Sequence, residues 1–144
     1  MSHTLEMLEA APRRWKLDLE EVAAAIDACE DCAATCTGCS DACVAEDDVA
    51  SLRRCIALCA NCADLCTAAA RILSRPSEGD VVLVQRLLEA CVRTCSASGE
   101  ECARHAEHHA HCAVCADACR TCERACRRVL DAEALAELRA LAGG

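Results

Sequence analysis

The sequence reads CEDCAATCTGCSDAC over residues 29–43, and its five cysteines follow one another at steps of 3, 4, 3 and 4 residues. Steps that average about 3.5 residues place successive side chains on one face of an α-helix. A β-strand would instead need side chains that alternate at every second residue. The segment therefore predicts a long helix that carries a stripe of thiols along one face.

Three further segments repeat this spacing, and each predicts another helix with a thiol face. The cysteines of the four segments are Cys29, Cys32, Cys36, Cys39 and Cys43; Cys55, Cys59, Cys62 and Cys66; Cys91, Cys95 and Cys102; and Cys112, Cys115, Cys119, Cys122 and Cys126. In the third segment Ser98 stands where the spacing would place a cysteine. The four segments account for all 17 cysteines of the chain.

The residues between the thiol segments set the limits of the helices. We expect helices over residues 18–45, from 49 to 73, from 80 to a point between 104 and 110, and from there past residue 126. The acidic run at 46–48 forms a short connector, while Pro76 and Gly79 interrupt the helical pattern. Because short connectors favour antiparallel neighbours, the expected fold is all-α, an antiparallel up-down-up-down four-helix bundle with a cysteine-lined core.

A chain of 144 residues is expected to form a single domain, 1–144, in which the core bundle spans about 18–130. Two flanking segments remain. Residues 2–11 predict a short N-terminal helix, and residues 131–142 carry leucines at helical spacing. Either segment could pack on its own bundle or on another subunit.

The connectors indicate where the thiols gather along the bundle. Cys43 and Cys55 flank the first connector, and Cys102 and Cys112 flank the third. In an antiparallel bundle these two connectors lie at the same end, so the four thiol stripes overlap at one level. The opposite end is expected to be lined by aliphatic residues: Leu19, Val22, Ile26, Ile72, Leu73, Val84, Leu87, Leu88, Val129 and Leu130.

Composition and charge exclude several classes of function. The net charge of −9 argues against nucleic-acid binding, which needs clustered cations, and Trp15 is the only aromatic residue. No uninterrupted run of eighteen apolar residues occurs, so we expect no membrane-spanning helix. The N-terminal residues lack a basic start followed by an apolar stretch, which favours a cytoplasmic protein whose thiols stay reduced.

Soft thiolates select Cu(I), zinc or iron–sulfur clusters. Four thiolates around Zn(II) carry a net charge of −2, whereas one Cu(I) per thiolate leaves the core neutral, and burying neutral groups costs far less. The pattern therefore favours storage of many Cu(I) ions. A zinc or general soft-metal buffer and a bundle held by disulfides between helices remain alternatives. No single cysteine stands out as a nucleophile, so we expect no catalysis.

The chain resembles the bacterial copper storage proteins over about residues 18–130. The resemblance rests on repeated Cys-x-x-x-Cys pairs: Cys32/Cys36, Cys39/Cys43, Cys55/Cys59, Cys62/Cys66, Cys91/Cys95, Cys115/Cys119 and Cys122/Cys126. It implies the cytosolic branch of the family, a homotetramer of four-helix bundles, and many Cu(I) ions along the bundle axis. A copper chaperone is then a candidate donor of the metal. Ser98 departs from the pattern, which puts one site with Cys102 in doubt unless another helix supplies a partner.

Histidines gather at the connector end of the predicted bundle. Continuing the 3, 4 spacing from Cys102 reaches His105 and then His109, and His111 immediately precedes Cys112. Because imidazole binds copper well, we interpret these three histidines as ligands at the mouth or as a relay for incoming copper. The alternative is that they are solvated side chains at a helix end. His108 leaves the spacing and is not included.

Overall fold

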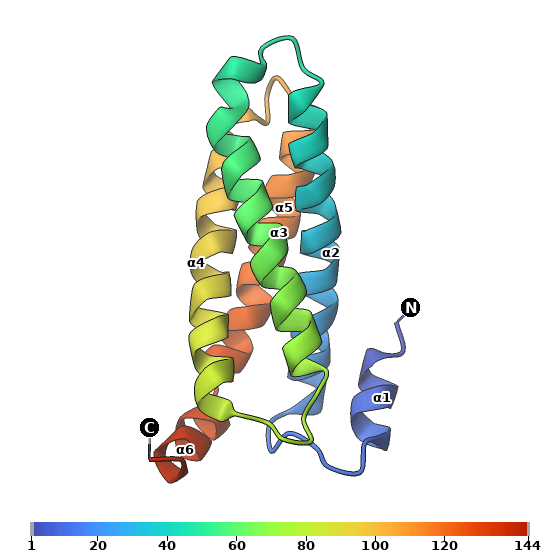
Figure 1. Cartoon of the computed structure of the whole chain (residues 1–144), viewed down its shortest axis with the longest axis vertical. Coiled ribbons are helices and arrows are strands. Elements are labelled where there is room, and N and C mark those ends of the chain that lie inside the picture. Colours follow the sequence, from blue (N-terminus) through green and yellow to red (C-terminus); the bar gives the residue numbers. More distant parts are fainter. Residues whose placement is uncertain (1, 144) are drawn as a thin grey trace.

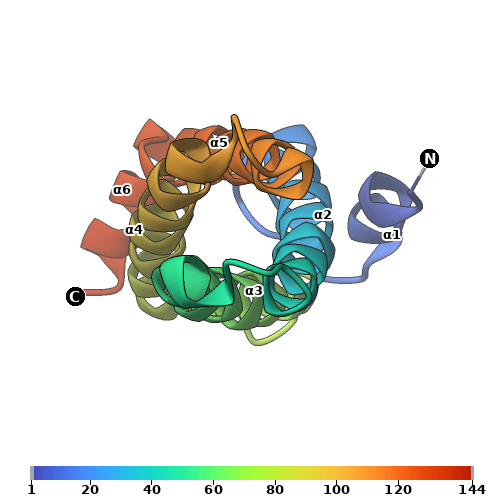
Figure 2. The same ribbon diagram turned by 90° about the horizontal axis from the view of Figure 1, so that it is seen from above.

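The structure is a computed structural model that describes residues 2–143. Its four long helices are α2 (Leu19–Val44), α3 (Arg53–Leu73), α4 (Val81–His105) and α5 (Ala110–Leu130). They form an elongated bundle with antiparallel neighbours (Figure 1). Seen from above, they close a ring in which α2 packs on α3, α3 on α4, α4 on α5 and α5 on α2 (Figure 2). The predicted all-α bundle is confirmed.

Capping side chains explain where two of the long helices begin. The Asp18 carboxylate accepts hydrogen bonds from the backbone N–H groups of Glu20 and Glu21, and Asp80 caps the start of α4 in the same way. Each cap satisfies donors that the first turn of a helix leaves without partners. Helices α2 and α4 therefore start within one residue of the positions expected from the sequence.

The start of the second predicted helix differs from the expectation. Residues Val49–Leu52 form a 3-10 turn, η1, and the α-helix begins only at Arg53. Ser51 explains the tighter turn, because its N–H and its hydroxyl both donate to the Asp48 carbonyl, at 2.9 and 2.8 Å. The end of the third helix, which the sequence left open between 104 and 110, lies at His105.

The two flanking segments form short helices that pack on their own bundle. Helix α1 (Thr4–Ala10) lies against the outside of α2, and α6 (Glu133–Leu141) lies against α4 (Figure 2). Leu8 and Leu135 are buried at these contacts. The Thr4 hydroxyl also donates to the Asp27 carboxylate at 2.6 Å, which ties α1 to α2.

The end of the bundle opposite the α2–α3 connector is closed by hydrocarbon. Several of the expected aliphatic side chains are completely or almost completely buried there: Val22, Ile26, Leu73, Val84, Leu88 and Val129. Trp15 covers this end, and its indole N–H donates to the Leu73 carbonyl at 2.7 Å. A Cβ atom at Gly79 would overlap the Trp15 ring, so the connector between α3 and α4 needs glycine at that position.

One helical stretch, Val49–Leu73, has the length and average hydropathy of a membrane span. It contains no uninterrupted apolar run of eighteen residues, because polar residues such as Asn61 and Asp64 break the run while its average hydropathy stays high. Its cysteines point into the bundle, and the core helix of a bundle satisfies the same criteria. The stretch is therefore weak evidence for a membrane segment.

Candidate metal centre

All 17 cysteine side chains point into the ring of helices, and none is more than 2% exposed. Contacting sulfur atoms lie 3.5 to 4.0 Å apart, as in the pairs Cys55–Cys102 and Cys39–Cys112. A disulfide bond is about 2.05 Å long. Metal–sulfur bonds of about 2.3 Å, the length in zinc thiolates, would instead let a single ion join two such sulfurs. The spacing of the thiols thus fits metal bridging without rearrangement of the helices.

The sulfurs form overlapping groups in which all the potential ligand atoms lie within 4.8 Å of one another. Five of these groups are Cys32, Cys36, Cys62 and Cys119; Cys32, Cys66, Cys95 and Cys122; Cys39, Cys59, Cys102 and Cys115; Cys29, Cys122 and Cys126; and Cys39, Cys43, Cys112 and His111. Most groups combine residues from three or four helices. Shared members such as Cys32, Cys39 and Cys122 link neighbouring groups, and the contact between Cys36 and Cys115 joins the groups near the mouth to the others, which suits ions that share bridging sulfurs.

Contacts within one helix and contacts between helices both contribute to this arrangement. Cys55 and Cys59, one turn apart on α3, have their sulfurs 3.9 Å apart. Cys102 on α4 contacts both of these sulfurs at 3.5 Å. Cys102 therefore has partners on α3, although Ser98 occupies the position one turn before it on its own helix.

Burial raises the pKa of most of the thiols, whereas hydrogen bonds from neighbouring thiols lower the pKa of Cys59, Cys66, Cys119 and Cys122. Loss of hydration raises the pKa of Cys112 to about 11. The hydrogen bond with Cys122, together with burial, raises the pKa of Cys29 far above the ordinary range for a thiol. Since the thiolate is the form that binds a metal, an ion that binds a protonated thiol displaces its proton.

His111 is the histidine that joins a thiol group directly. Its Nδ1 atom lies 3.4 Å from the Cys39 sulfur and 3.6 Å from the Cys112 sulfur. Its Nε2 atom lies 3.1 Å from a carboxylate oxygen of Glu46 in the α2–α3 connector. A carboxylate on the far nitrogen of a histidine fixes the orientation of the ring and directs the other nitrogen toward a metal. The sequence indicated Glu46 only as part of an acidic connector.

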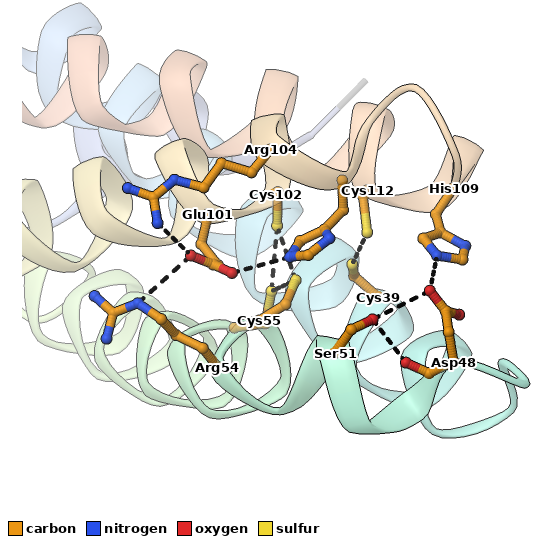
Figure 3. Close-up of polar contacts among 12 residues, drawn as sticks. Cys39, Asp48, Ser51, Arg54, Cys55, Glu101, Cys102, Arg104, His109 and Cys112 are labelled. Carbon is orange, nitrogen blue, oxygen red and sulfur yellow. Dashed lines mark hydrogen bonds and ion pairs between the residues drawn. The ribbon is translucent and has the colours of Figure 1, made fainter.

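His109 ties the two connectors at the mouth together. Its Nε2 lies 3.0 Å from a carboxylate oxygen of Asp48 (Figure 3), and its Nδ1 pairs with Glu46. The hydrogen bond with Asp48 is the main reason that the pKa of His109 is raised, and the same contact lowers the pKa of Asp48. Because α4 ends at His105, the helical register of Cys102 does not extend to His109.

Glu101 forms a second polar cluster between α3 and α4 that the sequence pattern did not reveal. Its side chain is only 7% exposed and lies 3.4 Å from Arg54 and 3.1 Å from Arg104 (Figure 3). His105 completes the cluster, with Nε2 at 3.0 Å from the other carboxylate oxygen. The cluster lies beside Cys102, so a buried carboxylate holds the two helices and His105 together next to the thiol core.

These features define a helical bundle whose interior is built to bind soft metal ions through thiolates. The model of the copper storage protein family matches residues 18–131, which include all four long helices. The chain therefore belongs to the copper storage protein family, whose members hold copper. A comparison with curated proteins found no match.

Solved structures of a copper storage protein from Streptomyces lividans are similar to the chain. The form loaded with 10 copper equivalents is 45% identical, with a TM-score of 0.87, and the alignment covers 89% of this chain and 98% of the other. The form with five coppers, which is described as cytosolic, is 49% identical with a TM-score of 0.77, over 78% and 94% of the two chains. A histidine-to-alanine variant is 48% identical with a TM-score of 0.79, over 80% and 96%.

Proposed function

We propose that this chain stores Cu(I) on all 17 cysteine thiolates and that His111 serves as a ligand at the mouth. The observation that carries the proposal is the continuity of the thiol groups through the interior. A site for transfer of one ion would need two or three cysteines, whereas groups that are linked by sulfur contacts through the interior provide capacity. Removal of free copper from solution would also protect the cell from its toxicity.

His105 and His109 act in this proposal as further ligands or as a relay at the mouth. Each holds a carboxylate in the metal-free bundle: His105 contacts Glu101, and His109 contacts Asp48. A histidine that exchanges such a contact for a copper ion could pass the ion inward to His111. The three histidines thus mark the side from which copper is expected to reach the thiols.

Charge favours Cu(I) over zinc as the stored ion. Arginine and lysine side chains are missing from the buried residues that the structure describes, so nothing in the interior would offset several zinc sites of net charge −2. Cu(I) thiolates in a ratio of one to one are neutral, and their burial carries no comparable penalty. A zinc or general soft-metal buffer is the second candidate function.

The relatives of the protein support a proposal for its cellular setting. Because the relative from S. lividans is a cytosolic copper storage protein, we place this chain in the cytoplasm as well. We propose a homotetramer, a copper chaperone as the donor, and a role without catalysis. We further propose that residues 1–144 act as one domain in which the bundle of about 18–130 carries the metal.

Titration of the fully reduced protein with Cu(I) under anaerobic conditions tests the main proposal. A chromophoric Cu(I) chelator competes for the metal, so its absorbance reports the copper that the protein has not taken. We expect the chain to bind more than about ten Cu(I) ions before the chelator does, given thiolate ligation. Uptake of only one or two ions would contradict storage.

Two controls separate the alternative functions. Metal analysis after growth with zinc or with copper, followed by displacement of each ion by the other, distinguishes a zinc buffer from a copper store. Counting of free thiols in the denatured, oxygen-free protein tests the disulfide-held bundle. A count near 17 supports the store, and a count near one supports disulfides.

A further inference from the structure

Ser98 interrupts the thiol lining at a level where all four helices meet. Its side chain is fully buried. The hydroxyl oxygen lies 3.5 Å from the Cys59 sulfur on α3, 3.5 Å from the Cys119 sulfur on α5 and 4.0 Å from the Cys36 sulfur on α2. Three helices thus provide a sulfur at this level, and α4 provides an oxygen.

The sulfur groups described above fall on the two sides of this level. On the mouth side, two groups share Cys39, and Cys55 contacts two of their sulfurs. Together these cysteines form what we call the mouth set: Cys39, Cys43, Cys55, Cys59, Cys102, Cys112 and Cys115. On the other side, the groups share Cys32 or Cys122 and define a deep set: Cys29, Cys32, Cys36, Cys62, Cys66, Cys91, Cys95, Cys119, Cys122 and Cys126. None of those five groups contains members of both sets.

The two sets are joined where Cys36 and Cys119 of the deep set meet Cys59 and Cys115 of the mouth set: Cys36 contacts both Cys59 and Cys115, and Cys119 contacts Cys115. The Cys36 and Cys115 sulfurs lie 3.6 Å apart, which is close enough for one ion to bridge them. Beyond the deep set the bundle is closed by the aliphatic side chains and Trp15. An ion that leaves the deep set therefore has a continuous series of thiols only toward the mouth, through these contacts at the level of Ser98.

A hydroxyl oxygen is a poor substitute for sulfur as a ligand of Cu(I), because soft ions select thiolates. We propose that Ser98 divides the copper store into a mouth compartment and a deep compartment, which exchange copper where Cys36 and Cys119 contact Cys59 and Cys115. This inference rests on the proposed function, since it assumes that the thiols hold copper. It adds that a single oxygen sets the order in which copper leaves.

The packing around Ser98 explains why a small group stands there. A Cβ atom on the neighbouring Gly99 would lie 3.3 Å from the Cys119 Cβ, so α4 and α5 approach each other closely at this level. A sulfur is larger than the hydroxyl oxygen and would be placed near the Cys119 sulfur. A Ser98→Cys variant must therefore be checked for helical circular dichroism before its copper release is interpreted.

Release of copper from the loaded protein into an excess of a chromophoric chelator tests the proposal. For the wild type we expect a fast phase of release from the mouth set and a slow phase from the deep set. The ratio of their amplitudes should be roughly seven to ten, the ratio of the numbers of thiols in the two sets. Ser98→Cys should give one phase and bind about one more Cu(I), given one ion per thiolate. Ser98→Ala is the matched control and should keep two phases, because neither a methyl group nor a hydroxyl binds Cu(I).

The outcomes separate this inference from the proposed function. High copper capacity with a single release phase in the wild type would overturn the division but leave storage intact, whereas uptake of only one or two ions would overturn storage itself. Two phases and unchanged capacity in a folded Ser98→Cys variant would also overturn the division. If that variant does not fold, Cys115→Ser decides: the slow phase should become several-fold slower, and an unchanged slow phase would refute the proposed contact.

Discussion

The Glu101 cluster allows a quantitative prediction about the metal-free bundle. Removing one partner from a fully buried ion pair costs about 3–5 kcal/mol, because the other charge stays buried. Here only the carboxylate is buried, and the side chains of Arg54 and Arg104 are 68% and 67% exposed. Water can therefore hydrate the arginines once the carboxylate is neutral, and each exposed pair is worth about 0–1 kcal/mol. We expect Glu101→Gln to lower the free energy of unfolding by about 1–2 kcal/mol.

Urea denaturation of the reduced, metal-free protein, followed by helical circular dichroism, measures this difference. The neighbouring Glu100 is exposed, so Glu100→Gln removes the same charge from the same helix turn and serves as the control. We expect that variant to stay within about 0.5 kcal/mol of the wild type. Equal stability of the two variants would show that the Glu101 contacts contribute nothing. A loss above about 4 kcal/mol would show that the arginines are desolvated in solution.

Three further predictions concern the stability of the bundle. Leu88 is fully buried, so Leu88→Ala should lower the free energy of unfolding, measured by urea denaturation, by about 2–5 kcal/mol. Leu83 is half-exposed, so Leu83→Ala should lower it far less, and equal losses in the two variants would contradict the closed aliphatic end. Asp18→Ala should lower the free energy of unfolding by about 0.5–2 kcal/mol, because it removes the cap of α2. The backbone amides of Glu20 and Glu21, which donate to Asp18, should then exchange their hydrogens faster. The contacts of His109 stabilise the fold when the imidazole is protonated, so their effect is complete below its unfolded pKa of about 6.5 and is lost as pH rises through its raised folded pKa. At low pH the effect is lost again below about pH 4, because the partner carboxylates of Glu46 and Asp48, whose pKa values are lowered in the folded protein, become protonated. The difference in melting temperature between wild type and His109→Asn should thus be largest near pH 5–6 and vanish at high pH, with the exposed His108→Asn as a control that shows no such profile.

Local sequence features predicted the thiol core and most helix limits. The cysteine spacing is periodic, so it fixes the inward face of each helix without knowledge of the neighbours. Capping residues such as Asp18 and Asp80 mark helix starts in the sequence itself. The overlap of the thiol stripes at one level then followed from connector lengths alone.

The polar contacts at the mouth could not be predicted in the same way, because they join residues that are far apart in the chain. Glu46 and His111 are separated by 65 positions, and the pairing depends on how two connectors meet. Glu101 also lacked any distinguishing feature in the sequence, since its burial results from the approach of α3 to α4. The placement of His109 by helical register failed because the register is lost where α4 ends.

The distribution of side chains along the bundle explains how it can remain folded both with and without metal. Thiols line the bundle from the mouth as far as Cys29 and Cys126, and their small side chains give limited apolar burial, whereas leucine, isoleucine, valine and Trp15 fill the closed end. Apolar burial stabilises a fold by about 25 cal/mol per Å², independently of any metal. The flanking helices add Leu8 and Leu135 to this part of the core. The metal-free protein should therefore retain its helical circular dichroism, so that copper enters and leaves a preformed interior. Loss of helicity on removal of copper would show that the closed end cannot hold the bundle alone.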